Sequence, residues 1–219
     1  MRIRLFIFLF IVGVLSNAQK YTVRKTLPPD PEPTLEDENR YREICDNIDS
    51  LGLYQIKKLV HVSGASSTQL YTRARTAISG WTGPDRRSEV NIDYSDKDEG
   101  IVIFKGHLSL GIRGLFVSMG WLRQANYVMQ VQCKDNRAQI TITVPTYSDI
   151  PVDISRRDVY MFDKKTFPIE DLVSIPTKKG KKALEKASRR AILYSSVLFE
   201  QTQNIISAIE NGLSSVDDF

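Results

Sequence analysis

The sequence predicts an α+β domain in which helices cover one face of an antiparallel β-sheet. An amphipathic helix with a recognisable cap at 66–81 follows one strand and precedes several others. The later strands alternate apolar and polar residues, a pattern typical of a sheet that is buried on one face and solvated on the other. A shorter helix stands before the sheet, and a single long helix at 181–212 follows it. Helices gathered on one side of an antiparallel sheet fit this order of elements.

The beginning of the chain predicts export. Residues 1–18 combine the basic residues Arg2 and Arg4, an apolar run, and small residues at the expected cleavage site, Ser16 and Ala18. This combination is typical of a secretory signal peptide. The apolar run is too short to span a bilayer comfortably, so an uncleaved anchor is the less favoured alternative. Because no cysteine follows the run directly, we expect a periplasmic or secreted protein without a lipid anchor.

The charge of the chain argues against one class of partner. Its 219 residues include 30 Lys and Arg against 26 Asp and Glu, a formal charge of +4. Loss of Arg2 and Arg4 with the signal peptide would leave 28 against 26, or +2. A nucleic-acid-binding domain should carry a concentrated basic face, so we expect no nucleic-acid partner. The length suits one domain with extensions.

Two segments precede the predicted sheet. Residues 19–34 are rich in proline and charge, which excludes helix and central strand and predicts an extended linker. Residues 35–52 follow Thr34 as a cap and have acidic residues in the first turn and apolar residues at helical spacing. We therefore predict a helix over 35–52 that ends at Gly52, a residue favoured after a helix terminus.

The central domain is predicted at 53–150 and begins with a strand at 54–62. Ser66 and Gln69 then have the spacing of a capping box, in which each side chain bonds the backbone of the other residue. The helix that follows this cap has one apolar face, which would lie on the sheet. That face consists of Leu70, Ala74, Ala77, Ile78 and Trp81.

A strand at 90–94, a turn at 95–100 and a strand at 101–110 form the next predicted hairpin. Gly100 supplies the positive φ that such a turn requires. Gly106, inside the second strand, indicates a bulge or a place where another group approaches the backbone closely.

Residues 111–125 have no clean period, because three glycines interrupt their apolar residues. We predict a long connection whose apolar tip is formed by Phe116, Met119 and Trp121. If these side chains are exposed together, they mark a contact with a partner or a membrane. The alternative is that they pack beneath the long helix as a satellite core.

The clearest hairpin joins strands at 126–134 and 138–144 through Asp135 and Asn136. One face of the hairpin is apolar and the other polar, so we expect the first to be covered and the second to be wet. The polar face offers a candidate interaction surface made of Gln130, Gln132, Thr141 and Thr143.

Residues 151–180 are predicted to be an irregular connection with one short helix near 169–173. The helix at 181–212 has an apolar seam, interrupted by Gln201, and is longer than most globular helices. We therefore expect part of it to project beyond the sheet or to meet a partner, a second copy included. The basic residues around its start oppose the helix dipole. These residues are Lys178, Lys179, Lys181 and Lys182. They either form a solvated helix end or contact acidic groups, which would belong to lipid headgroups or to the N-terminal helix.

The sequence has no recognisable catalytic, cofactor or metal motif. His61 and His107 lack ligand spacing, and the acidic turn at 96–99 lacks the residue order of a calcium loop. We therefore expect no catalytic, cofactor-binding or metal-binding residues. Cys45 and Cys133 can form one disulfide in an oxidising compartment or remain two buried thiols, and we prefer the second interpretation.

The order of elements and two motifs resemble a known family. The motifs are SGASSTQLYTRARTAISGW at the start of the capped helix and DYSDKDEGIVIFKG around the acidic turn. Together they resemble a family of secreted bacterial proteins of unknown function, found mainly in Bacteroidetes, whose domain has a TBP-like fold. The resemblance covers about residues 54–150. It implies a β-α-β-β-β-β sheet and no catalytic residues, and topology alone does not fix function.

The most favoured function is that of an exported, non-catalytic binding or interaction module of the bacterial cell envelope. Its partner would be an unidentified protein or small ligand. Peripheral membrane contact and self-association are further alternatives. One alternative is an envelope hydrolase whose site is recognisable only by geometry, with His61 or His107 beside a serine or carboxylate in a deep pocket. Another is a structural protein that self-associates through the C-terminal helix.

Overall fold

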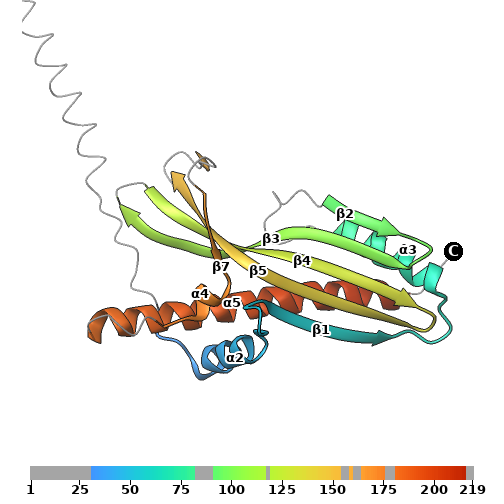
Figure 1. Cartoon of the computed structure of the whole chain (residues 1–219), viewed down its shortest axis with the longest axis horizontal. Coiled ribbons are helices and arrows are strands. Elements are labelled where there is room, and N and C mark those ends of the chain that lie inside the picture. Colours follow the sequence, from blue (N-terminus) through green and yellow to red (C-terminus); the bar gives the residue numbers. More distant parts are fainter. Residues whose placement is uncertain are drawn as a thin grey trace, which may run out of the picture.

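A computed structural model of the chain describes residues 31–81, 91–116, 119–153, 158–159, 164–175 and 181–215. It shows an elongated α+β architecture in which long strands and one long helix run side by side (Figure 1). The predicted fold class is confirmed. Nothing in the described residues bears on the predicted signal peptide at 1–18, and of the linker at 19–34 only the last four residues are described.

The sheet is antiparallel throughout and follows the order β1-β5-β4-β3-β2. Its strands follow the predicted order, in which one strand, a helix and four further strands succeed one another. Two short strands, β6 and β7, pair with the far part of β5. The bounds are β1 Tyr54–His61, β2 Asn91–Asp96, β3 Ile101–Phe116, β4 Met119–Lys134, β5 Arg137–Asp153, β6 Asp158–Val159 and β7 Lys165–Pro168.

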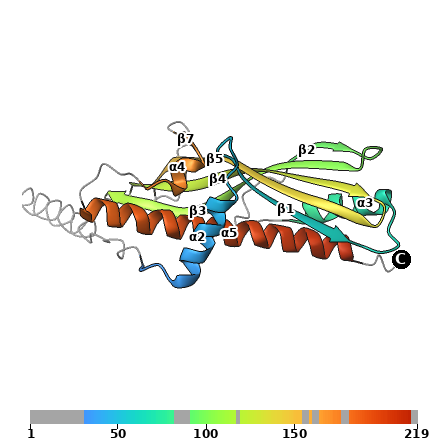
Figure 2. The same ribbon diagram turned by 60° about the horizontal axis from the view of Figure 1, so that its bottom comes forward.

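Helices pack against one face of the sheet (Figure 2). The long helix α5 has 34 residues and is therefore about 50 Å long. The 16 residues of β4 span about 53 Å, so the helix is about as long as this strand. The bounds are α2 Leu35–Asp46, α3 Ser67–Gly80, α4 Glu170–Val173 and α5 Lys181–Ser214.

The core lies between the sheet and α5. The predicted seam of the helix is buried at Leu198, Ile205 and Ile209, so it is used within the chain. Gln201, which interrupts this seam, donates a hydrogen bond from Nε2 to the backbone carbonyl of Ser109 in β3 (2.6 Å). A polar residue is therefore present in the apolar seam because it reaches the backbone of the sheet.

The capped helix forms as predicted and is tied to the turn between β4 and β5. The Ser66 side chain accepts a hydrogen bond from the Gln69 backbone N–H, and the Gln69 side chain accepts one from the Ser66 backbone N–H. The Asp135 carboxylate also accepts from the backbone N–H of Ser67 (2.8 Å), the position where a helix favours negative charge. The side-chain oxygen of Asn136 accepts from the Gly64 N–H (2.7 Å).

The predicted connection at 111–125 is wrong. β3 continues to Phe116 and β4 begins at Met119, so the two strands form one long hairpin. The register shifts between Ser109 and Gly111 and again between Arg113 and Phe116. Each shift inverts the alternation of side chains on part of the strand, which removes the period of two from the sequence. Gly106 marks a close approach, as predicted, because an added Cβ would lie 2.7 Å from the Tyr127 hydroxyl.

Other boundaries differ from the prediction for local reasons. The N-terminal helix ends at Asp46, because the Asn47 side chain donates to the Glu43 carbonyl and the Asp49 carboxylate accepts two backbone N–H groups in the turn that follows. The segment at 151–180 is less irregular than predicted. It contains the end of β5, β6 and β7, and a short helix, α4, at the expected place. Gly212 lies inside α5, where it packs against Ala77 of α3.

Cys45 and Cys133 are free thiols, the first half-buried and the second buried. Both are free, as the preferred interpretation expects, but only Cys133 is fully buried. Within the described residues, no helix has both the length and the apolar character needed to cross a membrane.

Candidate functional site

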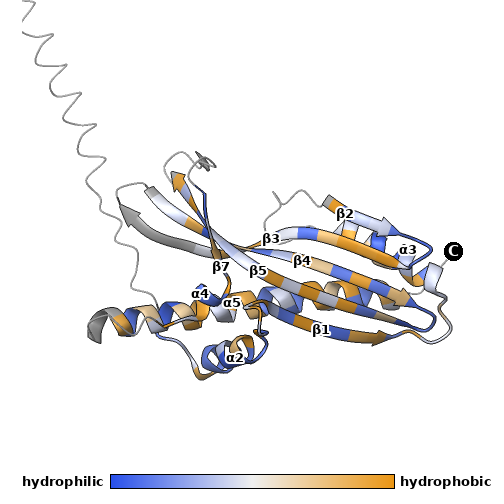
Figure 3. Ribbon diagram, viewed as in Figure 1, coloured by the Kyte–Doolittle hydropathy of each residue, from blue (hydrophilic) through white to orange (hydrophobic). Residues whose placement is uncertain are grey.

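The face of the sheet turned away from α3 and α5 carries the predicted interaction surface. Along β4 and β5 the apolar residues point to the helices and the polar residues to the other side, and Figure 3 shows this alternation along the strands. In the ladder Gln130 lies opposite Thr141, and Gln132 lies opposite Gln139. β1 adds Lys57 beside Thr141 and Leu59 beside Gln139. We call this surface the open face.

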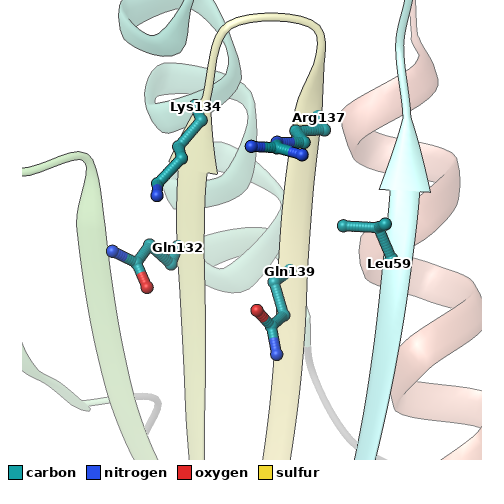
Figure 4. A pocket seen from close by; sticks show the side chains of 5 residues that line it. All are labelled: Leu59, Gln132, Lys134, Arg137 and Gln139. Carbon is teal, nitrogen blue, oxygen red and sulfur yellow. The ribbon is translucent and has the colours of Figure 1, made fainter.

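Two shallow hollows mark the open face. The first, of about 290 Å³, lies at the β4–β5 turn, and the second, of about 270 Å³, lies further along the strands. Gln132 and Gln139 line both, so the two form one continuous depression. The first is also lined by Leu59, Lys134 and Arg137 (Figure 4), and the second also by Gln55, Lys57, Gln130 and Thr141.

Most side-chain amides of the open face make no hydrogen bond to another described residue. Gln55 donates from Nε2 to the Thr143 hydroxyl (3.2 Å). In the part of the chain that the structure describes, the side chains of Gln130, Gln132 and Gln139 have no hydrogen-bond partner. Each of these amides can donate and accept, and each faces solvent. A ligand can therefore replace water at these groups without breaking a bond that the fold needs.

The open face has a basic corner at the β4–β5 turn. Lys134 and Arg137 lie directly opposite each other in the ladder, and His61 of β1 lies beside Arg137. All three are exposed. Among the described residues, no carboxylate forms an ion pair with Lys134 or Arg137. Lys57 is a further exposed cation on the same face.

The carboxylates Asp93 and Asp96, near the other edge of the sheet, bind groups within their own β2–β3 hairpin. Lys105 forms an ion pair with Asp93 (2.8 Å), beside the register shift in β2. Asp96 accepts hydrogen bonds from the backbone N–H groups of Asp98 and Glu99 (both 2.9 Å). These hydrogen bonds lower the pKa of Asp96. This geometry agrees with the prediction of a solvated hairpin turn.

The far halves of β4 and β5 contain polar residues of a different kind. Arg123 is buried and makes a bidentate ion pair with Asp149 (2.7 Å for both contacts). Its guanidinium also lies over the rings of Tyr147 (4.6 Å) and Tyr194 (4.8 Å). Burial alone would lower the pKa of Arg123, but the hydrogen bonds and charge of Asp149 outweigh it and raise the pKa. This arrangement joins α5 to the sheet.

A second polar cluster holds β7 to the sheet. Asn126 donates from Nδ2 to the hydroxyls of Thr146 (2.8 Å) and Ser148 (3.1 Å). Ser148 shares a further hydrogen bond with Thr166 of β7 (3.2 Å) and is fully buried. His107 Nδ1 lies 2.9 Å from Asn126 Oδ1. The polar atoms here are partnered, which indicates a role in the fold.

Of the remaining predicted residues, only Trp121 has a described side chain, and it lies away from the open face. Trp121 lies near the far end of the sheet, 37% exposed, with Lys165 Nζ 5.9 Å from its ring centre. Phe116 and Met119 pair with each other across the β3–β4 hairpin, and their side chains lie outside the described residues. Lys178 and Lys179 also lie outside the described residues. Lys181 and Lys182 are in the first turn of α5, but their side chains are not among those described.

The two histidines are separate and exposed. His61 lies on the edge strand β1 and His107 on β3, and neither lines the two hollows of the open face. Across the described ranges, no three His, Cys, Asp or Glu side chains gather in a way that could hold a metal ion.

Sequence reasoning missed half of the open face. Gln139 and Arg137 follow the alternation of β5, and Gln55 and Lys57 follow that of β1. The period of two could therefore have placed all four on the polar face. What the sequence could not supply is the pairing of β1 with β5, which brings residues more than 70 positions apart into one row.

The fold and the open face together define a small α+β domain with one sheet face covered by helices and the other open to solvent. Residues 57–148, from β1 to the middle of β5, match the family described as "Domain of unknown function (DUF4468) with TBP-like fold". The match agrees with the family resemblance that the sequence motifs predicted.

Solved structures include similar chains. A TBP-like protein from Parabacteroides distasonis has a TM-score of 0.49 and 16% sequence identity, over 76% of this chain and 96% of that one. A DUF4468 family protein from Bacteroides ovatus has a TM-score of 0.47 and 12% identity, over 80% of this chain and 97% of that one. No curated protein matches the chain.

Proposed function

We propose that the protein is an exported, non-catalytic binding module of the bacterial cell envelope that holds its partner against the open face. The observation that carries this proposal is the row of amides and hydroxyls across β1, β5 and β4. Gln130, Gln132 and Gln139 present hydrogen-bonding groups that no described side chain uses, and the helices all lie on the opposite side of the sheet.

The shape of the surface favours an extended partner. Sites that enclose a small molecule are concave and bury most of its surface. The two hollows here are shallow and joined through Gln132 and Gln139. A ligand that lies along the strands would contact both hollows at once, and it would form hydrogen bonds with side chains that face solvent.

A pull-down from an envelope extract of the producing cells tests this proposal. The variant carries Gln130→Ala, Gln132→Ala, Thr141→Ala and Thr143→Ala, and the matched control carries four exposed substitutions on α3 and α5: Thr76→Ala, Ser79→Ala, Asn204→Ala and Ser207→Ala. We expect the first variant to lose the partner that the wild type recovers and the control to keep it. Equal recovery by both at equal thermal stability would contradict the proposal.

Export is a separate part of the proposal and rests on the pattern at 1–18. Expression of the full chain in a Gram-negative host, followed by fractionation, tests it. We expect the mature protein outside the cytoplasm with Gln19 as its first residue, as read by intact mass. A cytoplasmic product of full-length mass would contradict it.

A further inference from the structure

The basic corner of the open face places like charges together without neutralising them. Lys134 and Arg137 are direct neighbours across the β4–β5 hairpin, and like charges in this position destabilise a sheet. Figure 4 shows both at the turn end of the first hollow, above Gln132 and Gln139. The fold gains nothing visible from this pair, because neither cation has an ion-pair partner among the described carboxylates.

The acidic residue closest in sequence is committed elsewhere. Asp135 stands between the two cations in the chain, but its carboxylate accepts from the backbone N–H of Ser67 at the start of α3 (2.8 Å). Asn136 likewise accepts from Gly64 (2.7 Å). The turn therefore directs its own acceptors toward the helix and leaves both cations on the open face.

We propose that this corner recognises the carboxylate groups of a hydroxyl-rich polymer, an acidic glycan. The inference rests on the proposed function and names the chemistry of its partner. The guanidinium of Arg137 can bind a carboxylate through two parallel hydrogen bonds, and Lys134 adds a second charge. Gln132 and Gln139 each offer a donor and an acceptor, which suits sugar hydroxyls because these also donate and accept.

The rest of the depression fits a chain rather than a single acidic sugar. From the row of Arg137 to the row of Thr141 is four residues along β5, about 13 Å. Lys57 lies beside Thr141 in that second row and offers a cation for a later carboxylate of the same polymer. Leu59, which is 49% exposed in the first hollow, supplies an apolar surface for the carbon face of a sugar ring.

The open face favours a glycan over an acidic peptide. Extended peptides usually bind by adding a strand to the edge of a sheet, where free backbone groups pair with them. Here β5 is paired on both sides, with β1 and β4, so a ligand on the floor of the hollows meets side chains, and the edge of the sheet at β1 lies to one side of that floor. Recognition must therefore come from the amides, Thr141 and the cations.

Calorimetric titration of the mature protein with oligogalacturonate tests the inference. The comparison ligands are the methyl ester of the same oligomer, which has no charge, and poly-L-glutamate. The variant is Lys134→Gln with Arg137→Gln, and the matched control is Arg75→Gln with Lys97→Gln, two exposed cations away from the hollows. We expect the variant to weaken oligogalacturonate binding at least tenfold, the control to leave it unchanged, and added salt to weaken it by screening.

Four outcomes would overturn the inference: no binding of oligogalacturonate, equal binding of the methyl ester, equal binding of poly-L-glutamate, or no loss in the Lys134 and Arg137 variant. Both cations are exposed and repel each other across the hairpin, so the variant should be as stable as the wild type or slightly more stable, which shows that any loss of binding is local. If oligogalacturonate fails to bind while the open-face alanine variant still loses its envelope partner, the glycan is wrong and the proposed function stands. If that variant also keeps its partner, both fail.

Discussion

Strands β4 and β5 carry polar side chains in two places, and the surroundings of the two groups are opposite. In the halves near β7, Arg123 and Asn126 are bonded to named partners on neighbouring elements. In the halves near β1, the amides of Gln130, Gln132 and Gln139 face solvent and have no side-chain partner in the described part of the chain. The same two strands therefore use polar residues for two purposes.

The difference follows from what covers each half. β7 pairs with β5 at Ser148 and removes that hydroxyl from water, so its hydrogen bonds must be made within the chain. β1 extends the sheet sideways and leaves its outer face open. Polar residues that are fully bonded support the fold, whereas those left in water cost little to keep and are available to a ligand. Substitutions in the two halves should separate these roles.

The largest effect is expected at Arg123. Replacement by Ala leaves Asp149, whose side chain is only 13% exposed, as a buried charge without a partner. We expect Arg123→Ala to lower the free energy of unfolding by about 3–5 kcal/mol, measured by urea denaturation.

The double variant Arg123→Met and Asp149→Leu provides the control for Arg123→Ala. Because it removes both charges, it should lose much less stability than the single variant. A loss below about 1 kcal/mol in Arg123→Ala itself would show that the ion pair does not hold this half of the sheet.

Thiols at the adjacent positions 132 and 133 of β4 should react at different rates, because the two side chains lie on opposite faces of the sheet. Cys133 is buried behind the sheet, and burial raises the pKa of its thiol to about 11. In a Cys45→Ser background, Cys133 should react with iodoacetamide at least about a hundredfold more slowly than the thiol introduced by Gln132→Cys on the open face. The unfolded protein in urea gives the reference rate for both, and equal rates in the native state would contradict the assignment of faces.

Much of the fold could be predicted because its signals are local. The capping box of Ser66 and Gln69, the turn at Gly100 and the alternation in β4 and β5 each lie within a few residues of sequence. The extension of β3 and β4 could not be predicted, because the shifts near Gly111 break the alternation that identifies a strand.

The candidate site was predicted only in part for a related reason. Gln130 and Thr141 share a hairpin, so their alternation places them together. Gln55 and Lys57 join them only through the pairing of β1 with β5, a long-range contact that sequence periodicity does not contain. The cover that β7 gives to Ser148 is equally remote, and so the division of β4 and β5 into a bonded and a free half required the structure.

A smaller loss is expected when Asn126 is replaced by Ala. Its side chain donates to Thr146 and Ser148 and accepts from His107 Nδ1 through its amide oxygen, so its removal leaves the buried hydroxyl of Ser148 with one partner fewer. We expect a loss of about 1–3 kcal/mol in the free energy of unfolding, measured by urea denaturation. If Asn126→Ala proved as stable as the wild type, the cluster would be no more important to the fold than the open face.

The smallest effect on stability is expected for Gln132→Ala with Gln139→Ala, in the free half of the same strands. Neither amide bonds a described side chain, so only the lower strand preference of alanine opposes the change. The free energy of unfolding in urea should therefore differ from that of the wild type by no more than about 0.5 kcal/mol.

A loss as large as that of Asn126→Ala would mean that these amides serve the fold, and it would remove the physical reason to regard the open face as a binding surface. A neutral result, together with loss of the partner in the pull-down, would assign these side chains to recognition, because the fold itself would have no measurable need of them.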